Sequence, residues 1–138
     1  MTLICCIDDR NGMSFHQKRQ SRDRILIENL LLLTQGKRLW MSPDSAKLFP
    51  SQDGIRADEN YATLCQEGDC CFVETGEFPS LAPKRMILYR WNRLYPSDRS
   101  FPARTLLQGF TLVSTRDFEG SSHPRITEEI YLKLGDEA

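Results

Sequence analysis

The segment from Asp69 to Pro102, DCCFVETGEFPSLAPKRMILYRWNRLYPSDRSFP, decides the fold of this chain. Its two apolar runs predict strands over residues 70–74 and 86–91, because both are short and rich in residues that favour strands. A turn around Gly76 separates them, and the second strand leads into an aromatic loop that is dense in arginine. Such strand ends are where α/β domains place ligand sites. We therefore expect the fold and any ligand site to be built around this segment.

Apolar runs with strand or helix character alternate along the rest of the chain. The expected strands are residues 3–7, 38–41 and 110–114, and the expected helices are residues 24–33, 44–49 and 58–65. The tail, residues 123–134, is open to helix or strand, and the spacing of Ile126, Ile130 and Leu134 favours a terminal helix. The alternation predicts an α/β fold with three layers, formed by a single domain over residues 1–138.

The composition excludes several classes of protein. A length of 138 residues with 40% apolar and 27% charged residues is typical of one globular domain with a substantial core. The net charge of −1 argues against binding to long nucleic acids, which requires a strong positive field. No apolar stretch reaches the roughly 18 residues of a membrane helix, and the N-terminus lacks the pattern of a signal peptide. We expect a cytoplasmic protein that binds no membrane.

The cysteines indicate neither a disulfide framework nor a metal site. Their number is odd, and two pairs are adjacent in the sequence: Cys5, Cys6, Cys65, Cys70 and Cys71. Zinc sites use wider spacings, and neighbouring residues of a strand point to opposite faces. We expect reduced thiols that pack as small apolar side chains.

The positive charges gather in two segments of an otherwise neutral chain. One cluster comprises Lys18, Arg19, Arg22 and Arg24, and the other comprises Lys84, Arg85, Arg90, Arg93, Arg99 and Arg104. Two such segments could form two walls of one pocket for an anion, or they could be solvated surface charges.

The heptapeptide RWNRLYP, residues 90–96, has the side chains that a nucleotide site needs. Trp91 and Tyr95 offer flat faces on which a base can stack, and the arginines pair with phosphate. The amide of Asn92 can form hydrogen bonds with the edge of a base. Strand alternation places Arg90 and Asn92 on one face and Trp91 with Arg93 on the other. The alternative is a core tryptophan covered by arginine stems.

In their order and spacing, these segments resemble dihydrofolate reductase over most of the chain. CIDDRNGM is similar to the first strand and the loop after it, and KRLWMSPDSAKLF is similar to the second strand and its phosphate-facing helix. The segment 69–102 resembles the fifth strand, the glycine turn and the sixth strand, and GFTLVSTRDF resembles the next long strand. The resemblance implies a shortened fold of this family with a mixed central sheet.

The chain departs from that family where the reductase has its chemistry. The resemblance implies an acidic residue in the first helix, but Leu26 stands there, and Asp23 and Glu28 are turned to other faces. The family's Gly-Gly turn is Glu74-Thr75-Gly76 here, and its carboxylate would repel a pyrophosphate.

The phosphate-facing helix differs as well. It opens with Pro43 and Asp44 instead of a basic residue, although Ser45 is retained. After Phe49 the segment that holds the adenine end of the cofactor is missing. We therefore expect no hydride transfer and no cofactor.

The segments QSRD, RLWM and RWNRLYPSD also resemble small bacterial and prophage proteins that carry the label ribonuclease Z. The metal site of that enzyme is built on a motif rich in His and Asp, whereas this chain has only His16 and His123, so we expect no metal site. Asp8 and Asp9 are expected to end a strand with one capping carboxylate, because adjacent side chains of a strand diverge. No nucleophile motif flanks either histidine, and we predict no catalytic residue.

Three functions remain open. The leading hypothesis is a non-catalytic protein that binds a small anionic, nucleotide-like ligand, with sequestration of a nucleotide immune signal by a prophage protein as one version. The alternatives are an enzyme (a divergent pterin or flavin reductase or a phosphodiester hydrolase) and a protein-interaction module that forms a homo-oligomer. The predicted ligand-binding residues are Arg22, Arg24, Ser45, Arg90, Trp91, Asn92, Arg93 and Tyr95.

Overall fold

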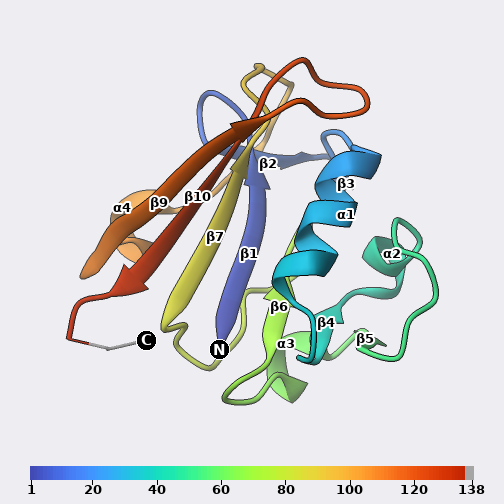
Figure 1. The fold of residues 1–138 in the computed structure, drawn as a ribbon, viewed down its shortest axis with the longest axis vertical. Helices are drawn as coiled ribbons and strands as arrows, with labels where there is room; N and C mark the ends of the chain where they lie inside the picture. Colours follow the sequence, from blue (N-terminus) through green and yellow to red (C-terminus); the bar gives the residue numbers. More distant parts are fainter. Residues whose placement is uncertain (136–138) are drawn as a thin grey trace.

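A central sheet of seven strands organises the protein in the computed structural model, which describes residues 1–135 (Figure 1). The strands are β1 (Thr2–Ile7), β4 (Leu39–Met41), β5 (Ile55–Ala57), β6 (Cys70–Phe72), β7 (Arg85–Arg90), β9 (Phe110–Phe118) and β10 (Ile126–Lys133). Their order across the sheet is β5-β4-β6-β1-β7-β10-β9. Neighbouring strands are parallel from β5 to β7, and β10 pairs antiparallel with both β7 and β9. The expected mixed central sheet is confirmed.

Helices and loops cover both faces of this sheet. The helices α1 (Arg24–Leu33) and α2 (Pro43–Ala46) pack on one face, and α3 (Tyr61–Leu64) and α4 (Ala103–Leu106) pack on the other (Figure 1). Alternate residues of β1 divide between the two cores: Ile4 faces α1, whereas Leu3 and Cys5 face α3. The expected three-layer α/β fold is confirmed.

A second, smaller sheet lies across the carboxyl end of β1 (Figure 1). It consists of β2 (Gly12–Phe15), β3 (Lys18–Arg19) and β8 (Arg99–Ser100), with β2 in the middle. Asp8 fixes the turn into β2, because its carboxylate accepts hydrogen bonds from the N–H groups of Arg10 and Gly12. The capping role expected for one of the two adjacent aspartates is confirmed.

The tail differs from the sequence-based expectation. Of the two structures left open for residues 123–134, the spacing favoured a helix, but Ile126–Lys133 is strand β10, inserted between β7 and β9. Residues four apart lie on one face of a strand as well as of a helix, so the spacing of Ile126 and Ile130 fits both. The in-facing residue between them is Glu128, a buried charge that hides the alternation of a strand.

Other boundaries shift by a few residues. The expected helices 44–49 and 58–65 shrink to α2 and α3, and the strand expected at 110–114 extends to Phe118. Four of the five cysteines are buried and all five are free, as expected for packed thiols. Among residues 1–135, no helix has the length and apolar character needed to span a membrane.

Candidate functional site

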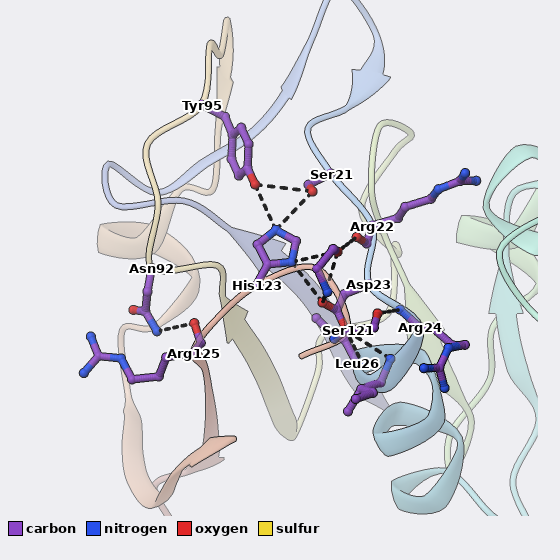
Figure 2. Close-up of polar contacts among 12 residues, drawn as sticks. Ser21, Arg22, Asp23, Arg24, Leu26, Asn92, Tyr95, Ser121, His123 and Arg125 are labelled. Carbon is purple, nitrogen blue, oxygen red and sulfur yellow. Dashed lines mark hydrogen bonds and ion pairs between the residues drawn. The ribbon is translucent and has the colours of Figure 1, made fainter. Parts of the chain in front are cut away.

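A buried polar cluster centred on His123 joins the loop between β9 and β10 to the N-terminus of α1 (Figure 2). His123 is only 3% exposed. The indole of Trp91 stacks on the imidazole, with the ring centroids 4.5 Å apart and the planes inclined by 26°. This stacking fixes the plane of the imidazole and aims its two nitrogens at defined partners.

Asp23 forms the base of the cluster. It is the N-cap of α1, and its Oδ1 accepts hydrogen bonds from the N–H groups of Ile25 and Leu26. The same carboxylate accepts from the N–H groups of Ser121 and Ser122 in the β9–β10 loop. One buried side chain therefore starts a helix and holds a loop about 100 residues away in the sequence.

The same carboxylate binds the imidazole. Oδ2 of Asp23 lies 3.0 Å from Nδ1 of His123, and both side chains are almost fully buried. Burial alone would raise the pKa of Asp23, but hydrogen bonds from His123 and from the N–H groups of Ser122, Ser121 and Leu26 outweigh it. The pKa of Asp23 is therefore held well below its usual range, and the carboxylate is ionised at neutral pH.

The other imidazole nitrogen faces two hydroxyl groups. Nε2 of His123 lies 3.1 Å from Oγ of Ser21 and 2.8 Å from the hydroxyl of Tyr95 (Figure 2). Because an ionised carboxylate only accepts hydrogen bonds, Asp23 selects the neutral tautomer with its hydrogen on Nδ1. In that tautomer Nε2 is an acceptor with one lone pair, for which the hydroxyl groups of Ser21 and Tyr95 compete as donors.

A groove of about 550 Å³ lies beside this cluster, between α1 and the segment that follows α2. We call it the α1 groove, and its lining comprises Arg22, Asp23, Arg24, Ile27, Glu28, Leu31, Lys47, Leu48, Pro50, Ser121 and Ser122. Arg22, Arg24 and Lys47 are exposed, which gives the groove three cationic side chains. Arg24 forms an ion pair with Glu28 at 3.1 Å, whereas within residues 1–135 the Arg22 guanidinium has no hydrogen-bond or ion-pair partner.

Of the eight predicted ligand-binding residues, the structure places two in this groove and two against His123. Arg22 and Arg24 line the groove, and Trp91 and Tyr95 contact the imidazole. Arg93 is exposed at the turn after β7. The remaining three residues are engaged in other interactions.

Ser45 belongs to a hydrogen-bond network that connects β3, α2 and the turn after β6. Its hydroxyl donates to Oε1 of Glu74 at 2.7 Å, and Nε of Arg19 binds both oxygens of that carboxylate at 3.1 Å. Arg19 also donates to the carbonyl and the carboxylate of Asp44, both at 2.9 Å. Burial raises the pKa of Glu74, and the hydrogen bonds from Ser45 and Arg19 oppose that shift without cancelling it.

Arg90 and Asn92 hold the end of β7 in place. The Arg90 guanidinium binds Glu129 at 2.7 Å on the face of the sheet opposite to Trp91, which matches the alternation predicted for these two residues. Asn92 has a positive φ of 58°, and its amide donates to the carbonyl of Arg125 (Figure 2). The same amide donates to the hydroxyl of Thr127.

Sequence reasoning missed the connection between Ser21, Asp23 and His123. In the sequence His123 has no flanking motif, and Asp23, the N-cap of α1, shows no link to it. About 100 residues separate the histidine from its two partners, so no local motif signals the contact. The described residues 1–135 contain no group of three or more His, Cys, Asp or Glu side chains arranged to hold a metal ion.

The fold is that of dihydrofolate reductase. In particular, the structure of dihydrofolate reductase from Enterococcus faecalis, complexed with NADP(H) and RAB-propyl, is similar with a TM-score of 0.62. The similarity covers 98% of this chain and 96% of that chain at 10% sequence identity, so it concerns the fold alone. No protein-family model and no curated protein matches the sequence.

Proposed function

We propose that this chain binds a small anionic, nucleotide-like ligand in the α1 groove and releases it unchanged. The observation that carries the proposal is an open groove of about 550 Å³ that presents Arg22, Arg24 and Lys47. The volume is that of an ordinary small-molecule site. Arginine pairs well with phosphate, and the guanidinium of Arg22 has no partner within residues 1–135 that would compete with a ligand.

The rest of the groove lining supports a ligand with an apolar body as well as an anionic group. Ile27, Leu31, Leu48 and Pro50 provide an apolar surface next to the cationic side chains. A nucleotide has this division, because its base is flat and largely apolar on its faces and its phosphate is charged. The proposal therefore assigns the base to this apolar surface and the phosphate to the arginines.

A thermal-shift and calorimetry panel tests this proposal. The panel contains nucleoside monophosphates, cyclic mono- and dinucleotides, NADPH and dihydrofolate, and cyclic nucleotides would be the ligands of a protein that sequesters an immune signal. We expect at least one nucleotide to raise the melting temperature, since saturation at 100 Kd stabilises a protein by about 2.7 kcal/mol. Recovery of unchanged nucleotide after incubation distinguishes binding from turnover.

Variants locate the binding site. Arg22→Ala combined with Arg24→Ala should weaken the nucleotide at least tenfold, or about 1.4 kcal/mol. Arg104→Ala is the matched control, because this exposed arginine belongs to α4 on the other face of the sheet. Loss of binding in Arg93→Ala instead would move the site to the RWNRLYP segment, and a panel without any stabilising ligand would refute the proposal.

A protein-interaction role is the second candidate, favoured by the open edge of β9. This strand has nine residues, it ends the sheet, and Leu112 and Val113 on it are 44% and 52% exposed. Long edge strands with apolar side chains tend to pair with other strands. A homo-oligomer detected by light scattering, together with no stabilising ligand, would favour this function.

A further inference from the structure

We propose that Ser21 is a nucleophile for acyl transfer from small carboxylic esters, with His123 as its general base and Asp23 as the positioning residue for His123. This activity goes beyond the binding function, and Ser21 and His123 do not line the α1 groove. Its basis is the alignment of a hydroxyl, an imidazole and an ionised carboxylate in one line of contacts (Figure 2).

The distances are those of an activated serine. Oγ of Ser21 lies 3.1 Å from Nε2 of His123, and Nδ1 of the same ring lies 3.0 Å from Oδ2 of Asp23. Both contacts fall within the 2.6–3.2 Å range that nucleophile–base and base–carboxylate pairs need. Serine, histidine and aspartate in these roles recur on unrelated folds, and geometry defines them better than sequence position.

The surroundings of His123 suit a general base. Asp23 is buried and ionised, so it fixes the reactive tautomer and would stabilise the imidazolium that forms when Nε2 takes a proton. The Trp91 ring prevents the imidazole from tilting away from Ser21. The groups around the ring are Asp23, Ser122, Ser21, Tyr95 and Trp91, and Asp23 is the one among them that carries a charge at neutral pH.

Tyr95 supplies a hydrogen-bond donor next to the nucleophile. Its hydroxyl lies 2.8 Å from Nε2 and 3.4 Å from Oγ of Ser21. When an ester carbonyl approaches Ser21, this hydroxyl can turn from Nε2 to the oxygen on which negative charge develops. The same movement leaves the Nε2 lone pair to Ser21.

A small cavity beside Ser21 has room for the water molecule that the second half of the reaction requires. It has a volume of about 10 Å³, and its lining includes Ser21, Gln20 and Trp91. That volume holds one water molecule. Oε1 of Gln20 is buried and accepts no hydrogen bond from any of residues 1–135, so it can accept one from this water. Since the cavity has no room for an acyl chain, the ester must approach the half-buried Ser21 from solvent, which favours short acyl groups.

The reaction balances with water as the only co-reactant. Oγ of Ser21 forms a bond to the carbonyl carbon while its proton moves to Nε2 of His123. The bond from that carbon to the alkoxy oxygen then breaks, and the imidazolium returns the proton to the leaving alcohol. Water attacks the acyl-serine in the same way, releasing the carboxylic acid and restoring Ser21.

Diisopropyl fluorophosphate tests the nucleophile directly on the full-length chain. The Ser21 oxygen would displace fluoride from phosphorus, and peptide mass spectrometry would locate the adduct. We expect one adduct, on Ser21, that forms at neutral pH and slows at least tenfold at acid pH, because a base that already carries a proton cannot accept the one from Ser21. Ser21→Ala should abolish it, whereas Ser51→Ala, an exposed loop serine, should not change it.

Two results would overturn the assignment. One is an unlabelled Ser21 under conditions in which a serine protease in the same tube is fully labelled. The other is labelling of Ser21 at a rate that does not fall at acid pH, because His123 would then not activate it. Ser122 offers an internal comparison: it lies 3.2 Å from Nδ1, the nitrogen that already carries a hydrogen, and it should stay unlabelled.

Discussion

The buried carboxylate of Asp23 stabilises three parts of the molecule at once. It caps α1, anchors the β9–β10 loop and binds His123, and its side chain is fully buried. Replacement by alanine removes the cap and leaves several buried donors without a partner. We expect Asp23→Ala to lower the free energy of unfolding by roughly 3 kcal/mol in urea titrations at pH 7. Asp9→Ala, at an exposed aspartate, is the control and should change it little.

The same substitution should alter the dependence of stability on pH. The pKa of Asp23 is lower in the folded chain than its ordinary value of 3.8, so ionised Asp23 stabilises the fold. This contribution is fully present above about pH 4 to 5 and is lost as the pH falls further toward the folded-state pKa. The stability gap between the wild type and Asp23→Ala should therefore narrow from pH 7 to pH 3. An unchanged gap would show that the ionisation of Asp23 contributes nothing.

Substitution of Gly120 tests how closely the β9–β10 loop packs against the carboxylate of Asp23. A Cβ atom at this position would lie 2.3 Å from Oδ2 of Asp23 and 2.8 Å from Cδ1 of Ile126. Neither neighbour can move freely, because both are buried. Gly120→Ala should cost about 1–3 kcal/mol of unfolding free energy, measured by thermal or urea unfolding. The adjacent exposed residue provides the control, and Glu119→Ala should be nearly neutral.

At the scale of elements, the segments that carried an unambiguous pattern were predicted well. Residues 24–33 were expected as a helix from their length and leucine content, and α1 spans this range. The strands at 3–7 and 86–91 were placed correctly because buried strands are continuous apolar runs. The lengths of the short helices were overestimated, because α2 and α3 are single turns whose ends depend on tertiary contacts.

The candidate site was predictable only in part. Arg22 and Arg24 were identified from charge clustering, and they line the α1 groove. Ser45 and Arg90 looked equally available, but each pairs with a carboxylate from a distant segment. The partners of His123 depend on the β9–β10 loop folding back onto α1, which residue spacing along the chain does not encode.

The sequence pattern favoured a helix where β10 lies, because the buried charge of Glu128 hides the alternation of a strand. Substitution of Glu128 therefore tests the placement of this strand. The Glu128 side chain is 5% exposed, and its carboxylate accepts a hydrogen bond from Asn29 and pairs with Arg116 at 3.5 Å. Glu128→Ala removes the buried acceptor that Asn29 and Arg116 share, so we expect a loss of about 2 kcal/mol in unfolding free energy. Lys133→Ala, at the exposed end of the same strand, should be close to neutral. Equal effects of the two variants would contradict the placement of Glu128 inside the molecule.

At the scale of the whole molecule, a fold similar to that of dihydrofolate reductase carries a buried hydrogen-bond network at the turn after β6. The resemblance to the reductase implies a pyrophosphate cradle at the turn that begins with Glu74. In this chain the Glu74 carboxylate is buried there, and Arg19 and Ser45 bind it. Arg19 also donates hydrogen bonds to Asp44, and these contacts connect β3 to α2. Similarity of fold does not by itself decide the chemistry, because function depends on the side chains of the site.

This arrangement predicts that NADPH is neither bound nor oxidised. A pyrophosphate in that position would face a buried carboxylate, and its entry would require the Arg19 contacts to both Glu74 and Asp44 to break. We expect saturating NADPH to leave the melting temperature unchanged, and NADPH with dihydrofolate to show no loss of absorbance at 340 nm above the rate without protein. A bacterial dihydrofolate reductase assayed in parallel is the positive control. Turnover by this chain would mean that the network of Arg19, Ser45 and Glu74 opens in solution, and hydride transfer would replace ligand binding as the function to pursue.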